Sequence, residues 1–317
     1  MSAQPSCLIV GAGMAGLTAA SALSAGGWQV TVVDKGRGVG GRMATRRIGD
    51  ARFDHGAQFF TVRDPKFQEQ VELWVGRGWV APWFEDGGHV RNMVIGGMSQ
   101  LAKHLAAPLN VRTGVKLSEV RPLGRGWKAT SDTGETYDAD ALLLTAPPEQ
   151  SLALLGDCAG GLADGVVAEL QAVDFDPCFA LMVLLNGPSQ VPEPGYFRPE
   201  SGPLEWLADN SRKGVSAGLS SALTVHATGD FSRLNFDRPT DEVASQLLAA
   251  AAPWLGSSVE SWQLHRWKYA KPVAGTWPGS LFSQTPSRVA FAGDGLAGGR
   301  VEGAFISGLA AARSLKY

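Results

Sequence analysis

Residues 7–34 read CLIVGAGMAGLTAASALSAGGWQVTVVD, and this stretch decides the fold. An apolar run at residues 7–10 is followed by a glycine-rich turn, an Ala/Leu/Ser-rich segment at residues 17–26 and a β-branched run at residues 30–33. This order predicts strand, turn, helix and strand, the βαβ unit of a dinucleotide-binding domain. A lone glycine motif would be weak in a chain with 40 glycines among 317 residues, but the complete unit is specific.

The glycines of the turn have separate purposes. Gly11 permits the tight bend, Gly13 lets a pyrophosphate approach the backbone, and Gly16 lets the helix pack close to the strand. The free N–H groups at the helix start, at Met14 and Ala15, are expected to hold the phosphate charge. The turn therefore predicts a dinucleotide site without separating FAD from NAD.

The acid that ends the second strand begins a more specific motif. Asp34 lies 18 residues after Gly16, where its carboxylate can accept hydrogen bonds from ribose hydroxyls. Arg42 follows two glycines and lies eight residues after Asp34, and with this spacing the segment resembles the flavin amine oxidase superfamily. The resemblance implies that Asp34, Lys35, Gly41 and Arg42 bind FAD, with Arg42 able to neutralise the diphosphate. The alternative is a solvated basic loop, because four arginines cluster here: Arg37, Arg42, Arg46 and Arg47.

Two further motifs occur in the family order. Residues 53–60 read FDHGAQFF and resemble a segment that passes along the flavin. Residues 289–294 read VAFAGD, and with the small-residue run at 301–312 they resemble the closing motif of the family. There the acid binds the ribityl or pyrophosphate part of FAD, and the helix N-terminus points at the flavin. The resemblance thus assigns FAD contacts to Ala57, Gln58, Phe59, Gly293, Asp294 and Glu302. For His55 we expect a hydrogen-bonded structural role, with a functional base as the alternative.

The rest of the chain completes an α/β fold. We predict a discontinuous Rossmann-type FAD-binding domain over residues 1–65, 95–150 and 285–317, in which Val115 gives the family's backbone contact to adenine. Residues 66–94 and 151–284 should form a second, mixed-sheet substrate domain. Further expected elements are a helix opening at 95–101, strands at 111–115, 117–120, 141–145, 179–185 and 258–267, a hairpin at 127–137 and a short helix at 247–252.

Composition and charge narrow the class of protein. A net charge of −2 offers no basic excess for nucleic acid or an anionic membrane. No apolar run reaches the roughly 20 residues that span a bilayer, and the N-terminus lacks the basic leader of a signal peptide. Cys7, Cys158 and Cys178 match no zinc or CxxC pattern, so we expect no metal and a reducing, cytoplasmic setting.

Departures from amine oxidases point to one branch of the superfamily. The strand at 177–183 lacks the lysine that hydrogen-bonds through water to the flavin, and residues 295–301 lack the aromatic that cages the amine. The chain is more similar to the renalase family over nearly its whole length, including residues 209–213, 225–228 and 267–269. That resemblance implies noncovalent FAD and oxidation of 2- or 6-dihydro-NAD(P) to NAD(P), with oxygen reduced to hydrogen peroxide.

The resemblance also suggests substrate residues. We expect His226, Trp267 and Tyr269 to form the pocket for the dihydronicotinamide ring, with Asn210 and Lys213 nearer its entrance. The alternatives for His226 and Arg300 are a core histidine and a solvated arginine. Three other functions stay open, together with the oligomeric state: a flavin-dependent amine oxidase, a desaturase or isomerase resembling carotenoid enzymes, and a non-enzymatic flavoprotein.

Overall fold

The computed structural model describes residues 4–218 and 220–316, which divide into two compact units. Unit 1 comprises the described residues up to Gly41, Ala102–Asp174 and those from Pro272 onward; unit 2 comprises Arg42–Leu101 and Phe175–Lys271. The domains predicted from sequence have other limits, near residues 65, 95, 150 and 285. They follow cofactor motifs, whereas the two units follow backbone packing, so the division by binding role stays a prediction.

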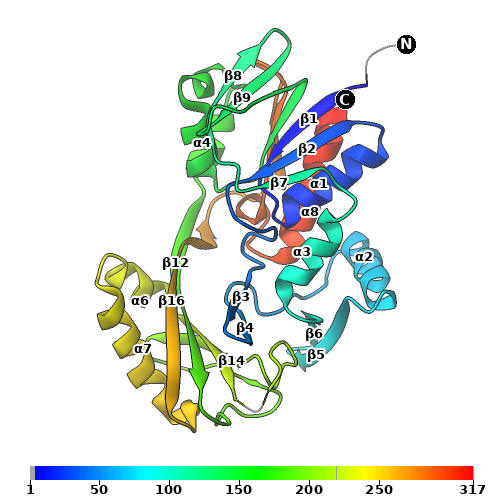
Figure 1. Ribbon diagram of the computed structural model, residues 1–317. Coiled ribbons are helices and arrows are strands. Elements are labelled where there is room, and N and C mark those ends of the chain that lie inside the picture. The colour runs from blue at the N-terminus through cyan, green and yellow to red at the C-terminus, as the bar shows by residue number, and fades with distance from the viewer. Residues whose placement is uncertain (1–3, 219, 317) are drawn as a thin grey trace. The chain divides into compact units, whose positions relative to one another are not determined.

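Unit 1 is built on a six-stranded sheet in the order β17-β18-β11-β1-β2-β7, visible in the upper part of Figure 1. Five strands run parallel, and β17 pairs antiparallel with β18 at the edge. Central strands of such a sheet are buried on both faces and are therefore continuously apolar. The strands are β1 Ser6–Val10, β2 Gln29–Asp34, β7 Val111–Thr113, β11 Ala141–Leu144, β17 Ser280–Ser283 and β18 Val289–Ala292.

Helices and a small sheet cover the strands of unit 1. Helices α1 and α8 pack so closely that a Cβ on Gly308 would lie 2.3 Å from the carbonyl oxygen of Ala15. A three-stranded antiparallel sheet, β10-β9-β8, lies within the same unit. The remaining elements are α1 Met14–Ala25, β8 Leu117–Leu123, β9 Gly126–Ser131, β10 Thr136–Ala139, α4 Pro148–Leu155, η1 Gly156–Gly161, α5 Val166–Gln171, η2 Asp294–Leu296 and α8 Val301–Lys316.

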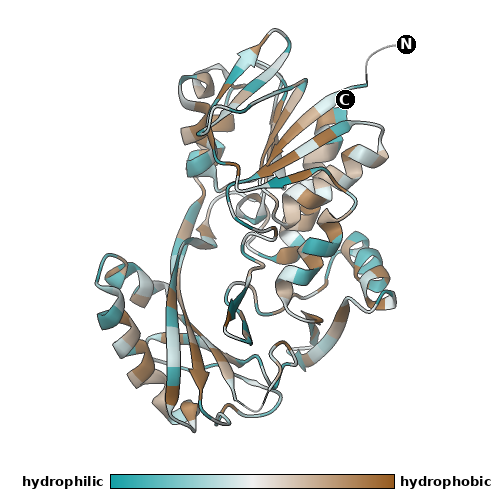
Figure 2. Cartoon of the chain, viewed as in Figure 1, coloured by the Kyte–Doolittle hydropathy of each residue, from teal (hydrophilic) through white to brown (hydrophobic). Residues whose placement is uncertain are grey.

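Unit 2 contains a five-stranded sheet in the order β13-β14-β15-β12-β16. Side chains at alternate positions, such as Leu181 on β12 and Val225 on β15, pack against Val243 and Leu247 of helix α7. Figure 2 shows both hydrophobic and hydrophilic residues on this helix. These elements are β12 Asp174–Leu185, β13 Tyr196–Phe197, β14 Leu204–Asp209, β15 Ala222–Ala227, α6 Gly229–Asn235, α7 Thr240–Leu255 and β16 Val259–Ala274.

The opposite face of this sheet carries the β3–β4 hairpin. Ala51 and Phe53 of the hairpin pack against Met182 of β12 and Ala222 of β15. The hairpin thereby lies against the sheet, and its side chains Ala51 and Phe53 are buried between the two. Unit 2 also holds β3 Thr45–Ile48, β4 Ala51–Asp54, α2 Pro65–Gly76, β5 Val80–Asp86 and β6 His89–Val94, and α3 Met98–Ala106 begins in it.

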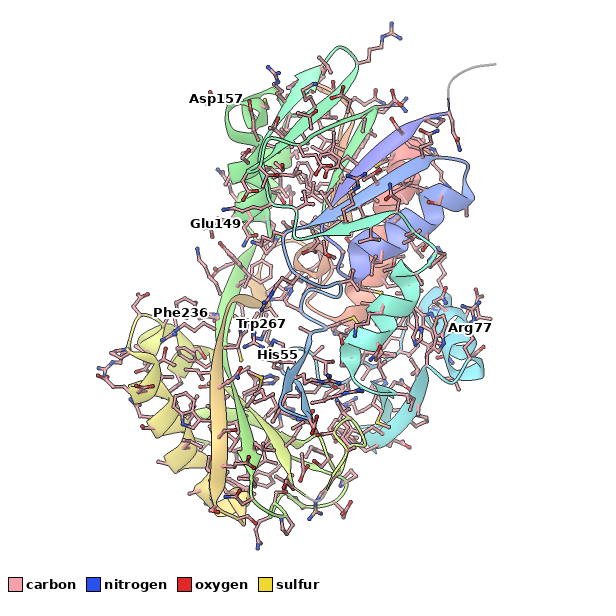
Figure 3. All side chains as sticks on the ribbon, in the orientation of Figure 1. His55, Arg77, Glu149, Asp157, Phe236 and Trp267 are labelled. Carbon is pink, nitrogen blue, oxygen red and sulfur yellow. The ribbon has the colours of Figure 1, made fainter. Side chains whose placement is uncertain are left out.

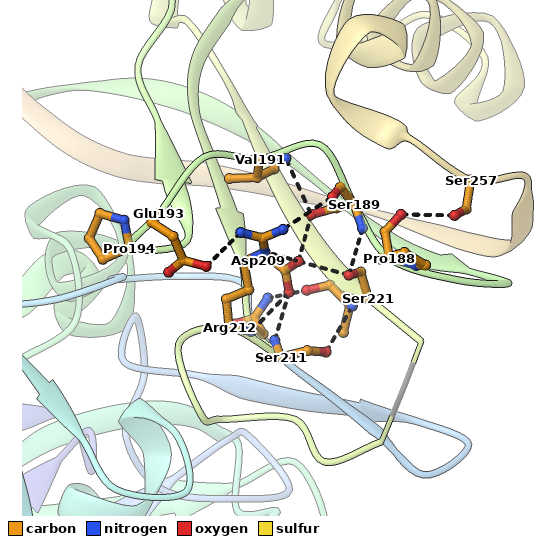
Figure 4. Close-up of polar contacts among 12 residues, drawn as sticks. Pro188, Ser189, Val191, Glu193, Pro194, Asp209, Ser211, Arg212, Ser221 and Ser257 are labelled. Atoms are coloured by element: carbon orange, nitrogen blue, oxygen red, sulfur yellow. Dashed lines mark hydrogen bonds and ion pairs between the residues drawn. The ribbon is translucent and has the colours of Figure 1, made fainter.

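A buried carboxylate organises the loop that follows β14 (Figure 4). Asp209 is fully buried, and its Oδ2 accepts hydrogen bonds from Ser189 Oγ at 2.6 Å and Ser221 Oγ at 2.8 Å. Its Oδ1 accepts from the N–H of Ser211 at 2.8 Å. Because hydrogen bonds to a charged group are strong, this network fixes both ends of the loop.

Most of the predicted elements are confirmed. The opening strand–helix–strand, the hairpin in residues 127–137 and the closing strand and helix all form. The predicted helix at 247–252 was too short, because the observed helix α7 already begins at Thr240. Pro239 precedes it, and Asp241 and Glu242 lie in its first turn, where acidic side chains stabilise a helix. Within the described part of the chain, no helix has both the length and the apolar character needed to cross a membrane.

The packing of α7 on the sheet predicts a large cost for Leu247→Ala. Leu247 is fully buried, and truncation of such a leucine lowers the free energy of unfolding by about 2–5 kcal/mol. Leu234→Ala is the matched control, because Leu234 is 82% exposed and should change stability by less than about 0.5 kcal/mol. Urea unfolding of both variants checks this, and equal midpoints would contradict the packing.

Candidate functional site

The glycine turn of unit 1 has the geometry that its sequence predicts. Gly11 has a φ of +112°, and its N–H donates to the carbonyl of Val33 at 2.8 Å. A Cβ on Gly16 would lie 2.0 Å from the carbonyl oxygen of Gly11. Only glycine fits at both positions, since one has a left-handed backbone and the other a backbone contact.

The start of α1 fits a phosphate. Gly13 is the residue before the helix, and it has no side chain to cap the free N–H groups of the first turn. That turn contains no acidic residue, and a Cβ on Gly13 would have no described atom within 4 Å. Open space beside uncapped N–H groups is the arrangement that binds an anion. Gly41 also lies here, because its Cβ would be 3.7 Å from the Cα of Gly13.

The carboxylate of Asp34 accepts hydrogen bonds from the backbone of the glycine turn and of the segment that follows β2. Its Oδ2 accepts from the N–H of Ala12 at 2.7 Å, and its Oδ1 accepts from the N–H of Gly36 at 2.7 Å. The carbonyl of Asp34 accepts from the N–H of Val115 at 2.9 Å. Each carboxylate oxygen keeps a second acceptor position for a ribose hydroxyl. At Val115 the carbonyl oxygen is the group left for adenine.

The closing motif is also positioned within unit 1. The N–H of Gly293 donates to Ser307 Oγ at 2.8 Å, and Asp294 and Glu302 are 9% and 7% exposed. Glu302 lies in the first turn of α8. The ammonium group of Lys35 donates to Gln150 Oε1 at 2.9 Å. FAD binding by these residues stays a prediction from the resemblance.

Asp54 is the polar centre of unit 2. It is fully buried, and its Oδ1 accepts from Thr45 Oγ1 at 2.6 Å and from the N–H of Met98, at the start of α3, at 2.8 Å. Its Oδ2 accepts from Lys213 Nζ at 2.8 Å. The backbone N–H of Asp54 donates to Asn210 Oδ1 at 3.0 Å. The carboxylate therefore joins β3, α3 and the loop after β14.

Lys213 and Asn210 do not lie where the sequence placed them. Both are almost completely buried, so neither lies near the entrance of a pocket. The ammonium group of Lys213 also donates to the carbonyl of Gln58 and lies 4.8 Å from the ring centre of Trp83. No local pattern indicates this pairing, because Lys213 and Asp54 are distant in the chain.

His226 and Trp267 meet at one backbone atom. The carbonyl of His55 accepts from Trp267 Nε1 at 2.8 Å and from His226 Nε2 at 3.1 Å. Because a carbonyl only accepts, the proton of His226 lies on Nε2. Thr224 Oγ1 donates to the neighbouring carbonyl, that of Asp54, at 2.9 Å. The polar atoms of both predicted pocket residues thus hold the segment that begins at His55.

The rings around this carbonyl form a cluster that Figure 3 locates by His55 and Trp267. The His55 ring stacks on Trp267 at 5.3 Å and meets His265 edge-on at 5.1 Å. His265 lies 4.3 Å from Trp267. Sequence reasoning missed His265, although the alternation that predicted this strand puts residues 265 and 267 on one face.

The imidazoles of His55, His226 and His265 are neutral at neutral pH, because the pKa of each is lowered. Burial, helped by the neighbouring His265 and Arg46, lowers the pKa of His55 from 6.5 to about 3. Burial also lowers the pKa of His226, and burial with the charge of Arg46 lowers the pKa of His265. Lowered pKa values at clustered histidines are typical of a functional site.

Gln58 presents an unused acceptor. Its Nε2 donates to the carbonyls of Asp54 and Gly56, which fixes the orientation of the amide. Its Oε1 is buried and has no hydrogen-bond donor among the described residues. A buried acceptor without a donor is costly in the free protein. Gln58 therefore fits a ligand that brings an N–H group, as the flavin ring does.

Tyr269 lies beside Arg42 in unit 2. Arg42 Nη1 donates to the carbonyl of Tyr269 at 3.4 Å, and its guanidinium lies 5.5 Å from the ring centre of Phe175. The rings of Tyr269 and Phe175 meet edge-on at 5.8 Å. Arg300, in contrast, is exposed. Within residues 4–218 and 220–316, no group of three His, Cys, Asp or Glu side chains could hold a metal ion.

Comparisons with known proteins agree with the predicted fold class. The family described as flavin containing amine oxidoreductase matches residues 67–316, and an NAD(P)-binding Rossmann-like domain matches residues 9–72. Renalase of Mus musculus is 22% identical over 339 residues, which cover 98% of each chain. A solved putrescine oxidase bound to putrescine has a TM-score of 0.74 at 15% identity, and a variant of it has 0.76 at 16%, each covering 99% of both chains. The predicted α/β Rossmann-type fold is confirmed.

The buried histidines predict a loss of stability in acid. Below its ordinary pKa of 6.5, His55 takes up a proton in the unfolded chain but not in the folded chain until about pH 3. Stability therefore falls as pH falls, by about 2 kcal/mol between pH 7.5 and 5 from His55 alone. Urea unfolding at both pH values should show a smaller difference in His55→Gln, while His104→Gln, at an exposed position, keeps the full difference.

The Asp54–Lys213 ion pair predicts an asymmetric response to mutation. Lys213→Met leaves a buried carboxylate without its cation and should cost about 3–5 kcal/mol of unfolding free energy. Adding Asp54→Asn should recover part of this loss, because the uncompensated charge is removed. Lys271→Met is the control: Lys271 pairs with Glu205 at 3.3 Å but is 62% exposed, so its cost should be within about 1 kcal/mol. Equal losses for the two lysine variants would contradict the pairing.

Proposed function

Because the chain belongs to the flavin containing amine oxidoreductase family, we propose that it is an FAD-dependent oxidase of isomeric dihydronicotinamide dinucleotides. Its substrates are the 2- or 6-dihydro forms of NAD(P), its product is NAD(P), and oxygen becomes hydrogen peroxide. Family membership makes the chain a flavin oxidoreductase. The similarity to renalase over 98% of both chains supports the choice of substrate within the family.

Each unit, taken by itself, holds residues that fit a part of FAD. In unit 1, the uncapped start of α1 beside Gly13 suits the diphosphate, and Asp34 suits a ribose. In unit 2, Gln58 offers its free Oε1 to an N–H group, and Arg42 offers a cation. FAD bound noncovalently would supply the hydride acceptor and pass the electrons to oxygen.

The neutral cluster of unit 2 is the observation that carries the proposed substrate. The N–H groups of His226 and Trp267 are used on the His55 carbonyl, and the Asp54 carboxylate is paired with Lys213. The lowered pKa of His55, His226 and His265 makes their neutral rings weak bases toward an ammonium. A dihydronicotinamide needs no base, because loss of a hydride makes its ring aromatic.

The chain's own residues would act by holding the substrate. The flat faces of Trp267 and Tyr269 suit an aromatic ring, and the neutral imidazoles keep their surroundings of low polarity. His226 acts on the backbone of His55 rather than on the substrate, which makes it a positioning residue in this proposal. Holding the ring in a reactive orientation then supplies much of the rate.

Net charge and cysteine content bear on the partners of the protein and on its compartment. The partners are a small-molecule substrate and oxygen, without nucleic acid or membrane, in accord with the net charge of −2. The three cysteines are free, which suits a reducing cytoplasm. The amine oxidase alternative differs in its substrate alone, so a single reduction experiment separates the two.

Anaerobic stopped-flow mixing tests the proposed substrate. Flavin absorbance should be lost rapidly with 2- or 6-dihydro-NAD(P), and slowly or not at all with ordinary NADH and with mono-, di- and polyamines. Gly13→Ala supplies the control, because its Cβ enters open space but blocks the approach of a pyrophosphate; it should fold and purify without flavin. Rapid loss with an amine alone would replace the proposal by the amine oxidase alternative.

A further inference from the structure

Arg46 lies on the face of the β3–β4 hairpin that packs on the sheet of unit 2. It is directly opposite Phe53 in the register of the hairpin, and cross-strand neighbours point to the same face. Phe53 packs with Met182 of β12, so the side chain of Arg46 leaves the hairpin on the sheet side. Its neighbour Arg47 pairs with Arg52 in register and points to the opposite face.

The side chains of His265 and Trp267 lie on one face of strand β16. Arg266, between them, points away, since its guanidinium donates to the carbonyl of Phe236 at 3.2 Å and to Thr240 Oγ1 at 2.9 Å. Successive side chains of a strand alternate between the two faces. The ring of His265 also contacts the ring of His55. His55 directly follows β4, the second strand of the hairpin that carries Arg46.

The guanidinium of Arg46 has no anion beside it. It is half-buried and makes no hydrogen bond or ion pair with any residue in the described ranges. The charge of Arg46 lowers the pKa of both His55 and His265, so its field reaches this cluster. A partly desolvated guanidinium presents five donors in a planar fork that suits a phosphate.

We propose that Arg46, beside His265, forms a subsite for a phosphate group of the substrate. This rests on the proposed function, under which the ligand is a dinucleotide with a diphosphate between two ribose units. Arg46 would bind the diphosphate, while Trp267 keeps its proposed role with the nicotinamide ring. The residues of this subsite belong to unit 2, whereas the glycine turn that suits the diphosphate of FAD belongs to unit 1.

Calorimetric titration of the FAD-loaded protein with inorganic pyrophosphate tests the subsite. Bound FAD fills the glycine turn, so added pyrophosphate reports on a different site. Arg46→Gln should weaken binding at least about tenfold, because it removes charge-assisted hydrogen bonds. Arg47→Gln is the matched control, since it removes the same charge one residue away on the opposite face, and it should change affinity less than about twofold.

The outcomes separate this inference from the proposed function. Absence of pyrophosphate binding, or equal binding by Arg46→Gln and the unaltered protein, would overturn the subsite even if dihydro-NAD(P) reduces the flavin. Pyrophosphate bound through Arg46 and displaced by NAD would support the substrate subsite. Binding through Arg46 that NAD does not displace would overturn the assignment to the substrate's diphosphate.

Discussion

The buried carboxylate of Asp54 is the constraint on which unit 2 depends. A charge inside a protein is tolerated only when cations and N–H groups surround it, and Asp54 gathers Thr45, the start of α3 and Lys213 around itself. The segment after it, with His55 and Gln58, is then fixed from both sides. Residues assigned to the cofactor therefore take their positions from the core of this unit rather than from a flexible loop.

Local patterns in the sequence predicted the βαβ unit and the closing strand and helix of unit 1, but not its edge strand β17. The turn at Gly11 and Gly16 can be predicted because its requirements are steric and lie within a few residues. The apolar run at residues 141–145 could be assigned to the same sheet because parallel strands are buried on both faces. Identification of the family depended on the spacing of such motifs along the chain.

The polar arrangement of unit 2 could not be predicted in the same way. The bonds of Lys213 to Asp54 and of Trp267 to the His55 carbonyl join residues more than 150 positions apart. No local pattern encodes which buried carbonyl a side chain will reach, because that depends on how the strands are ordered in the sheet. The assignment of His226 to the substrate pocket came from resemblance and stays a prediction, whereas its bond to a backbone carbonyl emerged only from the structure.

The strand order of unit 1 has a consequence for biosynthesis. The opening strand β1 pairs with β11, β11 pairs with β18, and the last helix, α8, packs on the first, α1. The sheet that carries the glycine turn is therefore complete only after β18 and α8 have left the ribosome. All of unit 2 is synthesised before then. Unit 2 can therefore fold while the sheet of unit 1 is still incomplete. A nascent chain of this protein would expose the apolar face of α1 from early in translation until α8 has been made, which is when chaperones bind such surfaces.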